Sequence, residues 1–245
     1  MIVISSLDND KVKKLRKLQM KKYRDRYNEY IVEGLHLVYE AYKIGVLDEL
    51  ILLEGENLPL PVPYTYYSKN VIKKISVMDT PSTVMGLCHK REKDEIVGNR
   101  ILILDDIQDP GNLGTIIRSA VAFNIDTIVL SNNTVDLYNS KVLRATQGMF
   151  FHTNIIIRNV FEIVALLRNI NIPIYGTDVN GGVDARSLDD EDKKRFALII
   201  GNEGNGVKKE LNDLCDKKLY IKMRKDVESL NVAIAGSILL YELGI

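Results

Sequence analysis

Three polar clusters in the C-terminal half of the chain combine residue types that can bind a ligand. The first is DDIQDPGNLGTIIRSA, residues 105–120, in which Asn112 can cap a helix that contains Arg118. Both side chains could project from this turn and helix into one crevice. The planar guanidinium of Arg118 would suit a phosphate or carboxylate there. The alternative is an ordinary capped helix with a surface arginine.

The second cluster is the glycine-rich segment LIIGNEGNGVKKEL, residues 198–211. Its glycines would let a ligand approach backbone amides after a buried strand, and Glu203 lies in the middle of the segment. Val207 stands where a P-loop needs lysine, and the order G-x-x-G-x-G differs from the dinucleotide motif, so both nucleotide-binding motifs are excluded. A plain tight turn is the alternative.

The third cluster, Glu228, Ser229 and Asn231, lies at the predicted start of a helix near residues 228–243. An N-cap on a packing helix explains the apolar positions at helical spacing, which are Leu230, Ile234, Ile238 and Tyr241. It does not explain why three polar side chains gather there. The chain has neither a G-x-S-x-G nor an H-E-x-x-H motif, which excludes serine hydrolases and zinc proteases.

Alternating strands and helices must position these clusters. From residue 100 onward, the pattern predicts helices between buried strands at 101–104, 127–130, 153–157, 172–175, 196–200 and 218–221. Such alternation indicates an α/β fold with a mainly parallel sheet, in which ligands bind at the carboxyl ends of the strands. The loops that follow the strands are therefore the expected site.

The first ninety residues predict a smaller α/β unit, with strands at 30–32, 50–53 and 84–88 and helices at 33–44 and 70–75. Gly45 is the expected C-cap of the longer helix. The charged run HKREKDEIVGNR, residues 89–100, marks a change of composition. We therefore expect one domain at 1–95 and a second at 96–245.

The composition is that of an ordinary globular protein. The 245 residues include 33 lysines and arginines and 33 aspartates and glutamates, and 46% of residues are hydrophobic. No apolar run approaches the roughly 20 residues of a membrane helix, and no secretory signal is visible, so we expect a cytoplasmic protein without membrane contact. The two cysteines and three histidines are too scattered for a disulfide framework or a metal site, so no metal is expected.

The zero net charge hides a basic N-terminal segment. Residues 1–28 hold nine lysines and arginines against three aspartates, and such a cluster could neutralise nucleic-acid phosphates. Its tyrosines, Tyr23 and Tyr27, could stack on bases. The alternative is a solvated amphipathic helix whose apolar face, Val12, Leu15 and Leu18, packs on a core. The side chains expected to contact nucleic acid are Lys13, Lys14, Lys17, Lys21, Lys22 and Arg24.

In this order, DPGNLGTIIRSA, IIGNEGNGV and VESLNVAIA resemble the three signature motifs of the SpoU (TrmH-like) family of RNA ribose 2′-O-methyltransferases, within the SPOUT superfamily. The match covers about residues 100–245. The segment from Val12 to Gly45 resembles, more loosely, the small L30e-like RNA-binding domain attached to many members. This resemblance implies a trefoil-knotted α/β domain, S-adenosyl-L-methionine as cofactor and a homodimer. By family analogy, the expected substrate is 23S ribosomal RNA, and transfer RNA is the alternative.

The resemblance also implies roles for single residues. The catalytic residues would be Asn112, Arg118, Glu203, Ser229 and Asn231, and the cofactor-binding residues Thr177, Gly201, Ile221 and Leu230. The family mechanism assigns removal of the ribose hydroxyl proton to the arginine. Because a neutral guanidine is scarce, we expect instead that Arg118 grips an RNA phosphate and polarises the 2′-hydroxyl, while Ser229 and Asn231 orient the arginine and the ribose.

The third motif departs from the family pattern at residues 221–225. Members commonly carry a proline before Met223 and a glycine two residues after it, where this chain has Lys222 and Lys225. Together with Arg224 these residues add positive charge, which could tighten phosphate binding or weaken cofactor binding. Two other classes stay open: a non-catalytic RNA-binding protein, which would not need all three motifs, and a base-methylating SPOUT enzyme.

Overall fold

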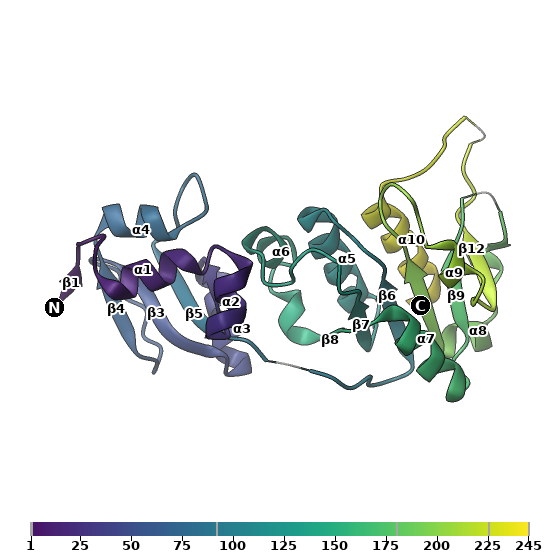
Figure 1. Ribbon diagram of the computed structural model, residues 1–245, viewed down its shortest axis with the longest axis horizontal. Coiled ribbons are helices and arrows are strands. Elements are labelled where there is room, and N and C mark those ends of the chain that lie inside the picture. Colours follow the sequence, from purple (N-terminus) through teal and green to yellow (C-terminus); the bar gives the residue numbers. More distant parts are fainter. Residues whose placement is uncertain (1, 92, 180, 225, 245) are drawn as a thin grey trace. The chain divides into compact units, whose positions relative to one another are not determined.

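The computed structural model describes residues 2–91, 93–179, 181–224 and 226–244. By its internal contacts the chain forms two compact units, labelled by their elements in Figure 1. Unit 1 comprises residues 1–91 and 136–151, and unit 2 comprises residues 92–135 and 152–245. Lys225, one of the added cations of the third motif, lies outside the described residues.

Unit 1 contains a five-stranded mixed sheet with the strand order β1-β4-β3-β5-β2. β5 pairs antiparallel with β2 and β3, and the other pairs are parallel. The strands are β1 Val3–Ile4, β2 Glu29–Glu33, β3 Leu47–Leu53, β4 Tyr64–Tyr67 and β5 Val84–His89. The helices are α1 Asp10–Lys17, α2 Lys21–Tyr27, α3 Leu35–Ile44, α4 Lys69–Ile75, α6 Ser140–Ala145 and the 3-10 turn η1 Met149–His152.

The apolar face predicted for the basic segment forms part of the core of unit 1. Val12, Leu15 and Leu18 are buried, in one cluster with Ile51 and Met85 of the sheet. Their spacing of three residues places them on one side of the helix, so the lysines and arginines occupy the other side. The amphipathic interpretation is therefore confirmed, and it is compatible with a basic outer face.

Residues 136–151 follow β7 in the sequence but pack within unit 1. The ring of Tyr30 lies 4.7 Å from that of Tyr138 and 6.3 Å from that of Phe150, measured between ring centroids. The chain therefore passes between the two units three times, whereas a division after residue 95 would require one passage.

Unit 2 contains a seven-stranded parallel sheet with the order β10-β12-β9-β11-β6-β7-β8. The strands are β6 Arg100–Leu104, β7 Thr127–Leu130, β8 Asn154–Ile157, β9 Ile174–Thr177, β10 Val183–Asp184, β11 Phe196–Ile200 and β12 Lys217–Tyr220. The helices are α5 Pro110–Ala122, α7 Val160–Asn169, η2 Ala185–Ser187, α8 Asp190–Lys194, α9 Lys209–Asn212 and α10 Val232–Gly244. The predicted α/β class and parallel sheet are confirmed, and the knot stays a prediction.

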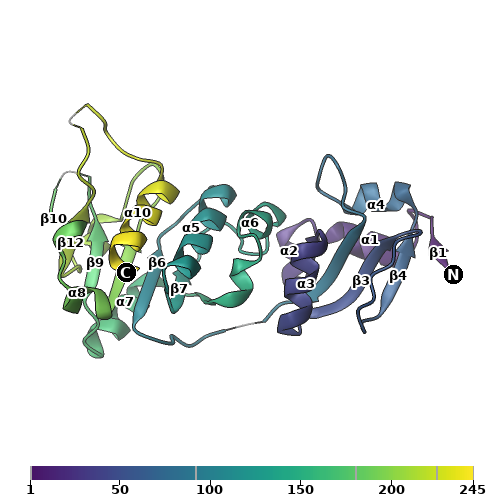
Figure 2. The same ribbon diagram turned by 180° about the vertical axis from the view of Figure 1, so that it is seen from behind.

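Helices cover both faces of this sheet, as the two opposite views in Figures 1 and 2 show. On one face, Ile163 of α7 and Leu211 of α9 share a buried cluster with Ile103 of β6. On the other face α5 packs against α10, and a Cβ at Gly236 would lie 3.0 Å from Ile200 Cδ1. Burial on both faces explains why the strands are continuous apolar runs. Among the described residues, no helix has the length and hydropathy needed to span a bilayer.

Candidate active site

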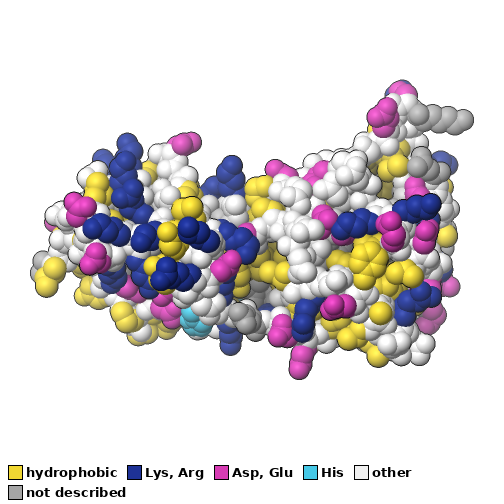
Figure 3. All heavy atoms as spheres, in the orientation of Figure 1, with side chains coloured by type: hydrophobic (Ala, Val, Ile, Leu, Met, Phe, Trp, Pro, Cys, Tyr) yellow, Lys and Arg dark blue, Asp and Glu magenta, His cyan; other side chains and the backbone are white. Residues whose placement is uncertain are grey.

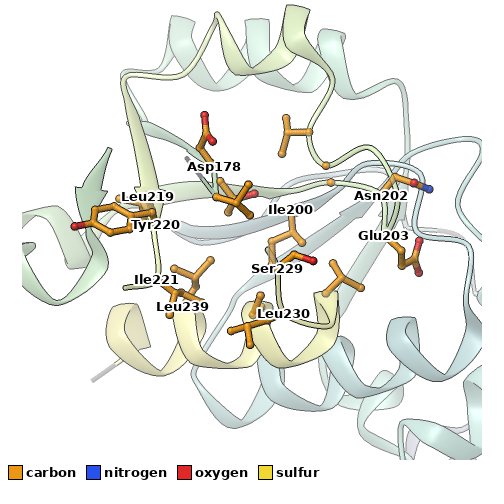
Figure 4. Close-up of a pocket in the computed structure, with 18 of the residues that line it drawn as sticks. Asp178, Ile200, Asn202, Glu203, Leu219, Tyr220, Ile221, Ser229, Leu230 and Leu239 are labelled. Atoms are coloured by element: carbon orange, nitrogen blue, oxygen red, sulfur yellow. The ribbon is translucent and has the colours of Figure 1, made fainter. Parts of the chain in front are cut away.

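A cavity of about 360 Å³ lies at the carboxyl ends of β9, β11 and β12, a size suited to a small-molecule ligand. All four residues predicted to bind the cofactor line it. Thr177 ends β9, Gly201 follows β11, Ile221 follows β12 and Leu230 precedes α10. Figure 4 shows Ile221 and Leu230 on the α10 side of the cavity. Parallel strands bring their carboxyl ends to one edge of the sheet, which is why residues so far apart in sequence meet here.

The glycine-rich loop forms one wall of this cavity, since residues 201–207 all line it. Asn202 and Gly206 exchange two backbone hydrogen bonds, of 3.0 and 2.9 Å, which close the loop into a hairpin. A Cβ at Gly201 would lie 2.0–2.1 Å from backbone atoms of Gly206 and Val207, so only glycine fits there. The segment is therefore a tight turn and also a wall of the cavity, so the two interpretations of its sequence are compatible.

One predicted catalytic residue from each cluster takes part in a hydrogen-bonded chain. Asn112 Nδ2 donates to Glu203 Oε1 at 3.1 Å, and Asn231 Nδ2 donates to Asn112 Oδ1 at 3.0 Å. The direction follows from chemistry, because an ionised carboxylate only accepts. Asn231 Oδ1 in turn accepts from the backbone N–H groups of Ala233 and Ile234 and caps α10.

Glu203 ties the glycine-rich loop to the start of α5. Its carboxylate also accepts from the backbone N–H groups of Gln108 and Asp109, at 3.2 and 3.1 Å. Burial raises the pKa of Glu203, but the hydrogen bonds from Asn112 and the backbone outweigh burial and hold that pKa below its usual value. Glu203 is therefore an ionised acceptor at neutral pH.

The N-cap of α5 is Asp109, whose Oδ1 accepts from the backbone N–H of Asn112 at 2.8 Å. The prediction that Asn112 caps this helix is wrong. Asp109 takes the position because Pro110 occupies the first turn, where its missing N–H is no loss. The side chain of Asn112 is thereby left to join Glu203 and Asn231.

Ser229 and Arg118, the other two predicted catalytic residues, are placed differently. Ser229 lines the cavity beside Leu230 (Figure 4), whereas Arg118 does not line it. Arg118 is exposed on α5 and has no hydrogen bond or ion pair with the residues that the structure describes. Six residues turn it roughly 120° around the helix from Asn112, so these two side chains do not share a crevice.

The lining fits S-adenosyl-L-methionine. Apolar side chains from Ile200, Leu219 and Leu239 offer surface for an adenine ring. The hydroxyl groups of Thr177 and Ser229, together with the backbone of the glycine-rich loop, offer partners for a ribose and an amino-acid group. In the described part of the chain, no group of three or more His, Cys, Asp or Glu side chains could hold a metal ion.

Several polar residues of the cavity were not predicted, among them Asp178 and Asn202. Asp178 follows Thr177, and Asn202 follows Gly201, so adjacency to a predicted residue was the available signal. Asn202 Oδ1 accepts from the N–H of Gly204, and its Nδ2 donates to the carbonyl of Asp106, each at 2.8 Å. Figure 4 shows Asn202 and Glu203 together at one end of the cavity, with Asp178 toward the other.

Cationic side chains gather over α1 and α2 of unit 1, as Figure 3 shows. Of the predicted nucleic-acid contacts, Lys13, Lys17, Lys21 and Lys22 are exposed. Lys14 with Glu29 and Lys21 with Asp25 form ion pairs of 2.6 Å each, and Lys13 forms longer ones of 3.8 and 3.9 Å with Asp8 and Asp10.

Arg24 departs from the prediction for this surface, because its side chain is only 7% exposed. Its Nε donates to Asp136 Oδ2 at 3.0 Å, and its Nη1 donates to the carbonyls of Leu18 and Gln19 at 2.8 Å each. Since the guanidinium is buried and engaged on several sides, Arg24 does not present its charge to RNA. Its role in this structure is to hold residues 136–151 in unit 1.

Two family models match this chain, one in each half. The model of the SpoU rRNA Methylase family matches residues 99–241, and that of the MRM3-like substrate binding domain matches residues 9–86. The 23S rRNA (guanosine(2553)-2'-O)-methyltransferase RlmP of Bacillus subtilis is 37% identical over 245 residues, which cover 98% of each chain.

Two solved structures of rRNA methyltransferases are similar to this chain over nearly its whole length. An rRNA methyltransferase from Sinorhizobium meliloti has a TM-score of 0.88 at 31% identity, covering 99% of this chain and 96% of that one. An AdoMet-bound rRNA methyltransferase structure from the same organism has a TM-score of 0.88 at 30% identity, covering 99% and 97%. AdoMet is S-adenosyl-L-methionine, the cofactor that the cavity lining fits.

Proposed function

The chain belongs to the SpoU rRNA methylase family and is an S-adenosyl-L-methionine-dependent RNA ribose 2′-O-methyltransferase, and from this premise we propose that its substrate is a 2′-hydroxyl of 23S ribosomal RNA. The Bacillus subtilis relative, whose name specifies 23S rRNA, supports this proposal because its match extends over both units. We also propose that residues 1–95 form the RNA-binding domain and residues 96–245 the methyltransferase domain.

The hydrogen-bonded chain of Glu203, Asn112 and Asn231 is the observation that carries the assignment of the site. Glu203 and Ser229 both line the cavity, so the hydrogen-bonded series begins, at Glu203, where the cofactor would bind. When bound, S-adenosyl-L-methionine supplies an electrophilic methyl group. The amides of Asn112 and Asn231 and the hydroxyl of Ser229 are then able to orient a ribose toward it.

Arg118 is proposed to contact RNA directly. It is exposed and carries a permanent charge, and no described residue competes for its guanidinium. A bidentate contact to a phosphate would place that charge near the 2′-hydroxyl and favour loss of its proton. In this mechanism Arg118 positions and polarises, and the proton leaves to the phosphate or to water.

Unit 1 is proposed to bind RNA through phosphate contacts of Lys13, Lys17 and Lys22. The rings of Tyr23 and Tyr27 are stacked, with centroids 6.2 Å apart. Lys17 and Lys22 lie over the ring of Tyr23, at 5.4 and 5.0 Å from its centroid. Because these cations occupy the ring faces, the patch suits phosphates better than bases.

We propose that the protein forms a homodimer in which a second copy covers the outward face of α10. Ile234 and Tyr241 of this helix are 54% and 53% exposed, while Gly236, Leu239 and Leu240 are buried on its other side. An exposed apolar face suits a protein partner, and a second copy is the partner that the family resemblance implies. The expected location is the cytoplasm, because ribosomal RNA is found there.

Mapping of ribose methylation in RNA from a deletion strain tests the substrate. We expect one 2′-O-methyl group to be missing from 23S rRNA and to be restored by the purified protein with S-adenosyl-L-methionine. If the missing group lies in transfer RNA and 23S rRNA is unchanged, the transfer RNA alternative is correct. If neither RNA loses a methyl group, the proposed function is contradicted.

A further inference from the structure

Lys208 bridges two aspartates at the carboxyl end of β6. Its Nζ lies 2.8 Å from Asp105 Oδ1 and 2.7 Å from Asp106 Oδ2. The side chain of Asp105 is only 2% exposed, whereas that of Lys208 is 43% exposed. The three residues belong to neither the predicted catalytic set nor the cavity lining.

The two aspartates need this cation. They are adjacent in sequence, and Asp105 Oδ2 is buried and accepts no hydrogen bond from the described residues. Burial lowers the pKa of Lys208, but its hydrogen bonds to Asp105 and Asp106 outweigh burial and raise that pKa. Burial also raises the pKa of Asp106, and the hydrogen bonds from Lys208 and Ser131 reverse this and lower it. The cluster is therefore a partly buried ion pair with one shared cation.

The position of Lys208 in the chain gives this ion pair a consequence for the cavity. Lys208 directly follows the hairpin of residues 201–207, which forms one cavity wall. At the other end of the hairpin, Asn202 Nδ2 donates to the carbonyl of Asp106 at 2.8 Å. The hairpin is thus attached at both ends to the residues that follow β6, and Glu203, between them, bonds to the start of α5.

We propose that Lys208 is a positioning residue for the S-adenosyl-L-methionine pocket, which fixes the glycine-rich wall by neutralising Asp105 and Asp106. The proposal rests on the assigned cofactor but not on the identity of the RNA. Without the cation, two neighbouring carboxylates at the end of β6 repel each other, one of them buried. The hairpin then loses the attachment at its C-terminal end, and the pocket is less well preformed for its ligand.

Binding of S-adenosyl-L-methionine to the full-length protein, measured by calorimetry without RNA, tests this proposal. We expect Lys208→Met to weaken binding by roughly tenfold or more and to raise the KM for the cofactor, with a smaller change of kcat at saturation. The matched control is Lys209→Met, the next residue, which is exposed on α9 and should bind as wild type does.

Two further variants separate charge compensation from a general loss of folding. Lys208→Arg, which keeps the charge and can reach both carboxylates, should retain most of the affinity. Adding Asp105→Asn to Lys208→Met removes the buried charge as well and should restore much of it. If Lys208→Met binds like Lys209→Met, or if the added Asp105→Asn restores nothing, the proposal is wrong, whichever RNA is the substrate.

Discussion

The side-chain amide of Asn112 donates to the carboxylate of Glu203 at 3.1 Å, although the two residues are 91 positions apart in the sequence. Asn112 belongs to α5 and Glu203 to the loop after β11, and these elements meet because β11 pairs directly with β6. A single carboxylate therefore joins the cofactor cavity to the helix that carries Arg118.

Replacing Glu203 with glutamine should lower stability in a pH-dependent way. The carboxylate accepts from three donors in the structure, and a glutamine amide offers only one oxygen. Because its pKa is lowered on folding, Glu203 contributes stability that is present above its unfolded pKa of about 4.3 and is lost as the pH falls through the lower folded value.

Urea unfolding of wild type and Glu203→Gln at several pH values measures this effect. The difference in unfolding free energy should be constant between about pH 6 and 8 and should shrink below about pH 4.5. A difference that stays the same down to pH 3.5 would show that the charge of Glu203 contributes nothing to the folded state.

Arg118→Ala should leave the fold and cofactor affinity nearly intact, because Arg118 is exposed and does not line the cavity. Methyl transfer should fall by roughly 100-fold or more, the scale of losing one preorganised electrostatic group. If Arg118 positions a phosphate, Arg118→Lys should recover little activity, since lysine lacks the bidentate fork. Substantial recovery with a shifted pH–rate profile would favour proton abstraction, and near-wild-type turnover of Arg118→Ala would remove the residue from the mechanism.

Arg24→Met should destabilise the protein by about 3–5 kcal/mol, the cost of leaving a buried partner charge uncompensated. Asp136 is that partner, and its side chain is 10% exposed. Adding Asp136→Leu should recover part of the loss in thermal unfolding, and Lys22→Met, an exposed neighbour, serves as the control. A melting temperature unchanged in Arg24→Met would mean that the buried pair does not hold residues 136–151 in place.

The double change Lys17→Gln and Lys22→Gln should weaken RNA binding and make it less dependent on salt. Each lost phosphate contact lowers the slope of log affinity against log salt by roughly one. Lys193→Gln with Lys194→Gln, in α8 of unit 2, removes the same charge elsewhere. Equal effects of the two pairs would indicate general electrostatics and no RNA patch on α1 and α2.

Introducing Ile234→Glu and Tyr241→Glu on the exposed face of α10 should give a monomer in sedimentation at micromolar concentration. The wild type should sediment as a dimer, since each of these side chains is about half exposed in a single copy. If the wild type sediments only at 27.8 kDa, no second copy covers this face.

The strands of unit 2 could be predicted from the sequence because they are buried on both faces. Ile101 and Leu102 point to opposite faces of β6, yet both are 0% exposed, so the strand appears as an unbroken apolar run. The same reasoning missed β4, Tyr64–Tyr67, whose tyrosines follow three prolines, and the two-residue β10. Short strands are defined by their partners and not by their own periodicity.

The remaining differences between the predictions and the structure come from tertiary contacts that the sequence does not reveal. The predicted packing stripe of α10 contains Ile234 and Tyr241, but Leu239 and Leu243 face the core, because a helix that is apolar all round does not reveal its buried side. Arg24 could not be told from its exposed neighbours, since its burial depends on Asp136, which is 112 residues away. The three cluster residues that do meet were named together by the family resemblance, and the strand pattern alone predicted only that loops at the carboxyl ends of the strands form the site.

Methyl transfer from labelled S-adenosyl-L-methionine to ribosomal RNA, followed by alkaline hydrolysis, tests the central claim most directly. A 2′-O-methyl group blocks cleavage of the adjacent phosphodiester, so the label should remain in one alkali-resistant dinucleotide. It should be absent when Asn112→Ala replaces the wild type, while that variant still binds the cofactor. Label that alkali releases in mononucleotides would place the methyl group on a base and would contradict ribose methylation by this chain.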